Sequence, residues 1–339
     1  MTGAGTSSNP ASPTSGAVDL EPLPADLVRV EAALRESVRT PDPFLGDVAS
    51  HLIGAGGKRL RPTLTLCAAY ASSWGGAPAA PVPDEVITGA VSVELVHLGS
   101  LYHDDVIDEA ETRRGVPSVN ARWNNIVAIL AGDFLLARAS SLAASLGADV
   151  AGLLAATIGE LCRGQVLELQ HLFDVGRTEE GYESTIEGKT AALFATACRI
   201  GGMVSDVDDA TLDALTRFGL HLGMCFQVVD DVLDLTATDE ALGKPSGQDL
   251  LEGVYTLPVI YALRDLPELR DRLGRPLDPD ELADARRVAT ANGVVDTALA
   301  VARDHATKAI GALQGADGLD PRVCGALTSL VDRQVTRQM

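Results

Sequence analysis

Two clusters of aspartates with the spacing DDxxD constrain this chain more than any other feature. The first is DDVID at residues 104–108 and the second is DDVLD at residues 230–234, and each ends an apolar run with helical character. Residues four apart share a face of a helix, so Asp104 points the same way as Asp108, and Asp230 the same way as Asp234. Such concentrated negative charge is costly unless cations neutralise it. Two carboxylate faces that meet in a cleft would hold Mg²⁺ ions, which would in turn hold phosphate oxygens.

The remaining sequence indicates an all-α protein. Aromatic residues make up only 4% of the chain, which favours helices over a β-rich fold, and no run alternates between polar and apolar residues. Helices are expected near 25–39, 62–70, 84–108, 124–146, 149–173, 179–203, 208–236, 258 onward, 279–291, 294–314 and 320–337. No linker interrupts this pattern, so residues 25–339 are expected to form one large domain. Residues 1–24 are rich in small and polar residues near their start and are expected to be a disordered tail.

Composition narrows the classes of partner. The net charge of −20 argues against nucleic acid as the main partner. The five cysteines are scattered without a CxxC pair, as expected of core residues in a reducing compartment. The N-terminus has neither the basic start nor the apolar run of a signal peptide, and no uncharged apolar stretch reaches about 20 residues. We therefore expect a cytoplasmic protein without a membrane span.

Two basic segments are candidates for phosphate binding. GGKRLRP at residues 56–62 places Lys58, Arg59 and Arg61 on a glycine-containing turn that enters a helix. Backbone N–H groups and three cations there suit a diphosphate, although a solvated basic turn would look the same. Arg113 and Arg114 follow the first aspartate cluster closely. They either pair with the aspartates at the surface or clamp the phosphates that the aspartates' metal ions hold.

Four isolated polar residues are weaker candidates. Lys189 and Lys244 lie near apolar or glycine-rich segments, where a surface position is the simpler interpretation. Gln227 lies three residues before the second cluster and therefore on the same helical face. His97 lies seven residues before the first cluster, where a lone histidine is more often a satisfied core residue than a ligand.

Together, these segments resemble the trans-isoprenyl diphosphate synthases, or polyprenyl synthetases. The resemblance runs from about residue 40 to 265 and, more loosely, to the C-terminus. It is carried by GGKRLRP, ELVHLGSLYHDDVIDEAETRRG, GDFLLA, EGKT, FQVVDDVLD and LGKPSGQDL, in that order. It implies a helical bundle of the isoprenoid synthase type with a central cavity.

The resemblance also implies a role for each matching residue. The proposed Mg²⁺ ligands are Asp104 and Asp108, with Asp105 in support, and Asp230 with Asp231 and Asp234. The cations that would hold the allylic diphosphate are Arg113, Lys189 and Lys244, and those that would hold isopentenyl diphosphate, together with a histidine, are Lys58, Arg61, Arg114 and His97. Thr190 and Gln227, with Lys189, match the catalytic positions that stabilise the developing carbocation. Glu168 matches an acidic position near the metals.

The implied activity is a Mg²⁺-dependent prenyl transfer, with about three Mg²⁺ ions per active site and a homodimeric enzyme. The metal ions and cations would stabilise the leaving diphosphate, and the double bond of isopentenyl diphosphate would attack the allylic carbocation. One departure from the family pattern is Val254, which replaces a lysine of the EGKxTLP run. Its replacement predicts weaker electrostatics at the allylic site in an active protein.

Chain length is predicted from the residues before the first cluster. In this family the residues four and five places before the first aspartate contribute to the floor of the product tunnel, and a large aromatic there ends elongation early. Here these residues are Ser100 and Gly99, which leave space. We therefore expect a product longer than fifteen carbons, most simply a long-chain polyprenyl diphosphate for a quinone side chain, with geranylgeranyl diphosphate as the alternative. Phe134 or Leu135 on the next helix would close the floor lower down.

Three other protein classes share part of this pattern. A class I terpene cyclase has the all-α fold and a first DDxxD, but differs in its second motif and lacks GGKRLRP. A metal phosphohydrolase of the HD type would use His103 and Asp104 as a ligand pair, but has no use for a second DDxxD. A non-catalytic subunit of a synthase typically loses one aspartate motif, and both are intact here.

Overall fold

The computed structural model describes residues 18–71, 81–238, 246–291, 293–316 and 318–336. Its described part is almost entirely helical, as predicted. The α-helices are α1 Leu23–Ser37, α2 Pro43–Gly54, α3 Leu60–Tyr70, α4 Asp84–Ile107, α5 Val119–Arg122, α6 Asn125–Ser145, α7 Ala148–Gln170, α8 Glu179–Ile186, α9 Ala192–Met203, α10 Asp209–Thr236, α12 Gln248–Glu252, α13 Leu257–Asp265, α14 Pro279–Ala289, α15 Val294–Gln314 and α16 Pro321–Thr336. A π-helical turn, Glu187–Ala191, joins α8 to α9, and a 3₁₀ turn spans Pro267–Leu269.

Small departures from the expected elements lie at the ends of the long helices. The predicted loop after the first cluster contains a two-stranded antiparallel hairpin, β1 Thr112–Arg113 and β2 Val116–Pro117. Helix α2 was not anticipated, and the side chain of Asp42 caps its N-terminus. Val18 and Leu20 are buried in the core, so the packed chain begins before residue 25. Residues 1–17 of the expected tail lie outside the described part.

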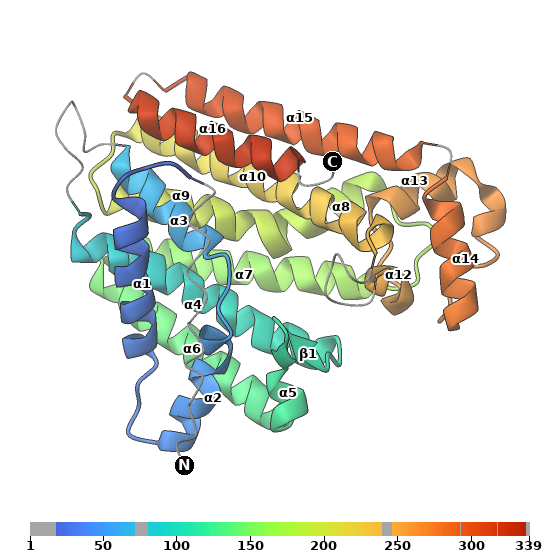
Figure 1. Ribbon diagram of the computed structural model, residues 1–339, viewed down its shortest axis with the longest axis horizontal. Helices are drawn as coiled ribbons and strands as arrows, with labels where there is room; N and C mark the ends of the chain where they lie inside the picture. The colour runs from blue at the N-terminus through green and yellow to red at the C-terminus, as the bar shows by residue number, and fades with distance from the viewer. Residues whose placement is uncertain (1–17, 72–80, 239–245, 292, 317, 337–339) are drawn as a thin grey trace, which may run out of the picture.

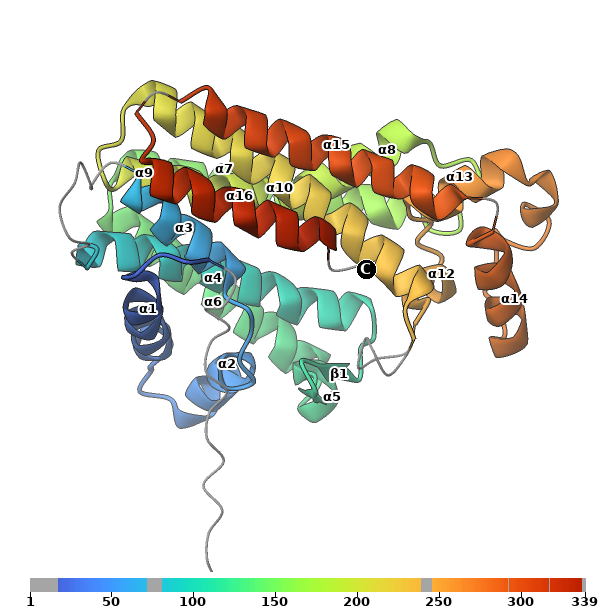
Figure 2. The ribbon, with the colours of Figure 1, turned by 45° about the horizontal axis from the view of Figure 1, so that its top comes forward.

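The core lies between long helices that run nearly the length of the molecule. Helix α10 packs against α9 and α15, and α4 packs against α6, α3 and α9 (Figures 1 and 2). Helix α4 has buried residues on all sides, as expected for a helix in the centre of a large fold. Helices α4 and α10 run in the same direction, so their C-terminal ends lie at the same end of the bundle, near β1 and α12 (Figures 1 and 2). The aspartate clusters therefore lie on neighbouring rims of the bundle.

Within the described residues, α6 and α7 are long and apolar enough to cross a bilayer by length and composition alone. The sequence had suggested no such segment. Only 33% of the most apolar window of α6 and 22% of that of α7 is buried. Both helices pack against other helices of the bundle, and core helices of water-soluble proteins pass the same test. The absence of a membrane span therefore stays a prediction.

Candidate active site

The two aspartate clusters meet at one cavity of about 100 Å³. Asp108 at the end of α4 and Asp231 of α10 line its walls. Glu168 of α7 and Lys189 of the π-helical turn lie between them, and the Lys189 ammonium donates to the Glu168 carboxylate at 2.5 Å. One aspartate of each cluster thus borders a shared space of mixed charge, although on α10 this residue is Asp231 and not Asp230 or Asp234 of the predicted face.

The first cluster has two different environments. Asp105 is fully buried, and its Oδ1 accepts a hydrogen bond from Arg113 Nε at 2.6 Å, so it holds the arginine in place. Asp104 faces the cavities instead. Burial raises the pKa of Asp104 to about 6, and the charges of Asp108 and Glu168 add to this rise while Lys189 and Arg113 oppose it. A nearby cation would stabilise the ionised form of such a carboxylate.

The second cluster is more firmly fixed to the protein. Asp231 accepts hydrogen bonds from the Tyr182 hydroxyl at 2.6 Å and from Gln227 Nε2 at 2.7 Å. Burial raises the pKa of Asp231 to about 7 despite these bonds. Asp234 is buried and accepts a hydrogen bond from the backbone N–H of Asp249 at 3.2 Å. Asp231 and Asp234 thus have structural hydrogen bonds in addition to their predicted role as metal ligands, which stays a prediction.

Asp230 is the half-buried member of the second cluster. Burial lowers the pKa of Arg61, and the negative charge of Asp230 lies close enough to oppose this effect. Asp230 therefore lies near the basic cavity described below, and its role as a Mg²⁺ ligand stays a prediction.

A short relay of hydrogen bonds joins the predicted catalytic residues. The Thr190 hydroxyl donates to Gln227 Oε1 at 2.7 Å, and Gln227 in turn donates to Asp231. Thr190 and Lys189 stand on the π-helical turn, a geometry that is frequent at functional sites. Gly164 of α7 lies against this turn, where an added Cβ would stand only 2.2 Å from the backbone nitrogen of Lys189. This close approach brings Glu168, one turn further along α7, beside the Lys189 ammonium.

A second cavity, of about 280 Å³, is lined by basic residues and two aromatic rings. Lys58, Arg61, His97 and Arg114 are brought together there with Phe194 and Phe226, as the resemblance implied. The Arg61 guanidinium lies 4.8 Å from the centre of the Phe194 ring. Burial and then the charge of Arg114 lower its pKa to about 10, so Arg61 stays charged near neutral pH. Burial and the surrounding arginines lower the pKa of His97, which is therefore neutral.

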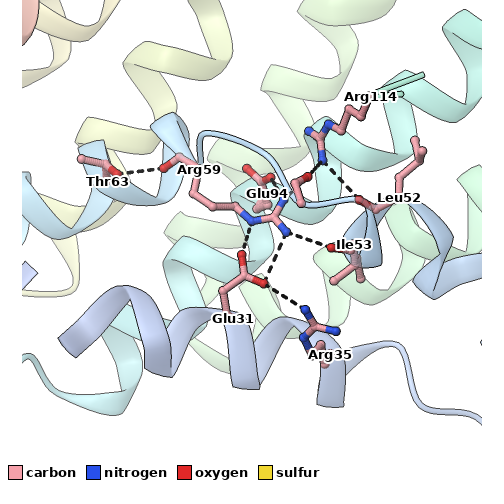
Figure 3. A network of polar contacts seen from close by, with 9 residues as sticks. Glu31, Arg35, Leu52, Ile53, Arg59, Thr63, Glu94 and Arg114 are labelled. Atoms are coloured by element: carbon pink, nitrogen blue, oxygen red, sulfur yellow. Dashed lines mark hydrogen bonds and ion pairs between the residues drawn. The ribbon is translucent and has the colours of Figure 1, made fainter. Parts of the chain in front are cut away.

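Arg59 has a structural role in the basic turn. Its guanidinium is buried and donates from Nη1 to Glu94 Oε1 at 2.9 Å, while Nε contacts Glu31 of α1 (Figure 3). Arg59 adopts a left-handed conformation, with φ of 49°. Arg114 also contacts this turn, because its Nη1 donates to the carbonyl oxygens of Gly56 and Leu52 (Figure 3). Arg59 thus anchors the turn, while Lys58 and Arg61 line the basic cavity.

A third cavity, of about 270 Å³ and mostly apolar, lies between α4, α6 and α7 below the first cluster. Ser100 lines it as predicted, together with Leu136, Ile158 and Leu161. Gly99 lies instead at the contact of α4 with α6, where an added Cβ would stand 3.1 Å from the Gly132 carbonyl oxygen.

Gly99 is therefore a packing residue, and the predicted opening at this level rests on Ser100. On α6, Leu136 lines the cavity in place of the expected Phe134 or Leu135. Leu135 is fully buried in the core. A period of 3.6 residues separates wall from core here by a single position, so the sequence alone does not show which of these neighbours faces the cavity.

The carboxylates suit Mg²⁺ in number and chemistry. Among the described residues no three of them converge closely enough to hold a metal ion unaided. Mg²⁺ is usually held by one or two carboxylates together with substrate phosphates and water. Asp104 and Asp108 line two of the cavities and would hold Mg²⁺ in this manner, and Asp230, whose charge acts on Arg61, would be the ligand from the second cluster.

Several residues of the site were given no role from the sequence. Arg177 and Tyr182 line the first cavity and lie outside every segment that carries the resemblance. Asp249 and Glu252 of the first cavity and Glu94 of the second lie within or beside those segments, but their positions at the site were not predicted. Val254, the departure from the family pattern, also lines the first cavity. The predicted Lys244 lies outside the described residues. Amphipathic periodicity does not report such residues, because their places depend on how the segment at residues 246–256 folds back over α7 and α8.

Comparison with known proteins places these features in context. The sequence model of the family described as polyprenyl synthetase matches residues 42–292. Nonaprenyl diphosphate synthase of Mycobacterium tuberculosis is 40% identical over 323 residues, which cover 92% of each chain. A polyprenyl synthase of Caulobacter crescentus, solved with calcium and isoprenyl diphosphate, is 34% identical with a TM-score of 0.86, covering 95% of this chain and 99% of that one. Geranylgeranyl pyrophosphate synthase of Corynebacterium glutamicum is 40% identical with a TM-score of 0.78, covering 93% and 96%.

Proposed function

Because the chain belongs to the polyprenyl synthetase family, we propose that it condenses isopentenyl diphosphate with an allylic diphosphate to give a long-chain trans-polyprenyl diphosphate. The observation that carries the proposal is a set of three cavities that border α4 or its C-terminal end. One is lined by Asp108 and Asp231, one aspartate from each cluster, one is basic, and one is mostly apolar. Diphosphate activation, acceptor binding and product accommodation each have a place with suitable chemistry.

The chain's own residues account for the reaction steps. Mg²⁺, proposed as about three ions per active site, would neutralise the diphosphate oxygens as the allylic C–O bond breaks. Lys189 is held beside the aspartates by Glu168 and adds a positive charge at the leaving group. The Thr190 and Gln227 oxygens lie where positive charge develops. Arg61 and Lys58 hold isopentenyl diphosphate so that its double bond forms the new C–C bond, and the released proton passes to the departing diphosphate.

The apolar cavity favours the long-chain product. Its wall on α4 carries the small Ser100, and its other walls are aliphatic side chains of α6 and α7. Buried apolar surface of this kind excludes water from the carbocation and accommodates a growing isoprenoid. The relative that makes nonaprenyl diphosphate matches along 92% of both chains, which supports a long product, and a quinone side chain is its proposed destination. Geranylgeranyl diphosphate remains the second candidate, since a structural relative of equal identity carries that name.

The direct test is an incubation with Mg²⁺, isopentenyl diphosphate and each of dimethylallyl, geranyl, farnesyl and geranylgeranyl diphosphate in turn. Products are sized by chromatography after removal of the diphosphate. A ladder that ends beyond twenty carbons supports the proposal. Cyclised hydrocarbons without consumption of isopentenyl diphosphate would indicate a terpene cyclase instead, and a main product of twenty carbons would favour the second candidate.

We also propose a cytoplasmic homodimer. Exposed aliphatic side chains gather on α6 at Ile126, Ile129 and Leu130 and on α7 at Val166 and Leu169. Association of two copies through this surface would remove it from water. A monomer mass in light scattering at micromolar concentration would contradict the dimer. Recovery of the enzyme in the membrane fraction after cell lysis at high salt would contradict the location.

A further inference from the structure

Arg177 is a buried arginine that the reaction described above does not use. It precedes α8, and only 5% of its surface is exposed. Its Nη1 donates to the Tyr255 carbonyl oxygen at 3.0 Å and its Nη2 to the Thr185 hydroxyl at 3.0 Å. Among the described residues, its buried Nε has no hydrogen-bond partner, and no carboxylate lies within ion-pair distance of it.

A buried guanidinium without a partner anion is costly, because its desolvation is not offset by a nearby opposite charge. Burial lowers the pKa of Arg177, while the more distant charges of Glu168, Asp231 and Asp174 and the neighbouring Tyr182 oppose this effect. A guanidinium has five N–H donors, and the hydrogen bonds to the Tyr255 and Thr185 oxygens use two of them. The remaining donors and the full positive charge are available to an anion.

Arg177 lines the same cavity as Asp108, Glu168 and Lys189. Five carboxylates border this cavity, and Lys189, its other cation, is already paired with Glu168. Val254 borders the cavity one residue before Tyr255, whose carbonyl Arg177 holds. The guanidinium therefore lies next to the part of the wall where residue 254 borders the cavity.

The contacts around this wall fix the guanidinium in place. The backbone N–H of Phe173 donates to the Gly253 carbonyl at 2.8 Å. The Phe173 ring covers Gly253, where an added Cβ would stand 2.6 Å from the ring. The segment at residues 253–255 is thus attached to the α7–α8 connection at two points, which keeps Arg177 and Val254 on one rigid surface.

We propose that Arg177 is a diphosphate-binding residue of the allylic site and supplies the positive charge that Val254 lacks. The inference rests on the proposed function, because it assigns the anion as the diphosphate of the allylic substrate. Arg177 binds the anion through the donors that the Tyr255 and Thr185 oxygens leave over. The Michaelis constant of the allylic substrate therefore depends on Arg177, and that of isopentenyl diphosphate does not.

Four variants test this assignment. Arg177→Met removes the charge at similar length, and Arg177→Lys keeps the charge. Thr185→Val removes one anchor of the guanidinium without changing charge, and serves as the control for a purely structural role. Val254→Lys in the Arg177→Met background returns a cation to the same wall from another position.

Two measurements are made on each variant. Calorimetry with inorganic pyrophosphate and Mg²⁺ reports anion binding without turnover, and initial rates give the Michaelis constants of farnesyl and isopentenyl diphosphate separately. Arg177→Met is expected to weaken the Mg²⁺-dependent binding of pyrophosphate about tenfold or more, the range of a lost charge-assisted contact. It should raise the Michaelis constant of farnesyl diphosphate similarly and leave that of isopentenyl diphosphate within about twofold. For Arg177→Lys, the pyrophosphate affinity and the Michaelis constant of farnesyl diphosphate should lie between those of Arg177→Met and wild type.

The double variant is decisive, because a lysine at position 254 cannot restore the contacts of Arg177 with Tyr255 and Thr185. Recovery of pyrophosphate binding in it supports the proposal. Wild-type binding in Arg177→Met, no recovery in the double variant, or an equal loss in Thr185→Val would overturn it. If wild type transfers no prenyl group but Arg177→Met still loses pyrophosphate binding, the anion site stands and the proposed function fails.

Discussion

Replacement of Asp104 by asparagine should stabilise the metal-free protein while abolishing turnover. Burial and the neighbouring carboxylates raise the pKa of Asp104 from 3.8 to about 6. Between these values the folded protein binds a proton that the unfolded chain has released, so stability falls as pH rises through this range. Above pH 6 the ionised side chain costs up to about 3 kcal/mol. Asparagine has nearly the same shape without the charge.

The assay is urea denaturation of wild type and Asp104→Asn at pH 4.5, 6 and 8, with chelator present. At pH 4.5, where the folded protein keeps Asp104 protonated but most of the unfolded chain has released this proton, the variant should be only about 1 kcal/mol more stable. At pH 8 the variant should be about 2 to 3 kcal/mol more stable, which shifts the urea midpoint by about 1 M for a slope near 2 to 3 kcal/mol/M. Asp47→Asn, at an exposed site on α2, is the control and should change stability by less than about 0.5 kcal/mol.

Addition of Mg²⁺ with pyrophosphate should reverse the order of stability. Ligands that bind only the folded state stabilise it in proportion to their affinity, and the variant lacks one of the proposed metal ligands. The reasoning would be refuted if Asp104→Asn were no more stable than wild type at pH 8 in chelator. It would also be refuted if Mg²⁺ and pyrophosphate stabilised both proteins equally.

Three further changes probe the other parts of the site. Ser100→Phe should shorten the product, because the added ring would fill part of the apolar cavity, whose closely packed walls cannot move aside. An unchanged product ladder in chromatography would contradict the prediction that Ser100 leaves space for the growing chain. Lys58→Ala and Arg61→Ala should raise the Michaelis constant of isopentenyl diphosphate at least about tenfold and that of the allylic substrate much less, and equal effects in initial-rate assays would argue against separate sites. Tyr182→Phe should cost about 1.5 to 3 kcal/mol in thermal or urea unfolding, because Asp231 loses a buried hydrogen bond; no loss would mean that water replaces the hydroxyl.

Much of the helical architecture could be predicted from the sequence. The helix that ends in the first cluster was expected because Asp84 follows prolines at its start and apolar residues continue to the aspartates, and α4 spans Asp84–Ile107. The expected helix at 208–236 corresponds to α10, Asp209–Thr236. Apolar periodicity and helix-starting residues are local signals, and they suffice for long helices in a large core.

Tertiary relations were less accessible to the sequence. Arg59 belongs to the same basic motif as Lys58 and Arg61, but the half-buried Glu31 and the buried Glu94 hold it behind the turn. Glu31 lies 28 residues away along the chain, and no local pattern connects the two. Likewise, Gly99 and Ser100 are neighbours in sequence, and only the position of α6 decides which of them faces the cavity.

The π-helical turn at Glu187–Ala191 has a consequence for changes in chain length. It holds one residue more than an α-helical turn in a helical run that is continuous from α8 to α9. The extra residue is bulged out of the helix, so deleting it would let the run become regular and leave α9 in nearly the same orientation. Phe194 would stay beside Arg61, but the bulge would be lost and the polar side chains of the turn would shift relative to the cavity. We therefore expect insertions and deletions among descendants of this chain to be confined to the connections outside residues 179–203, while this run keeps its length.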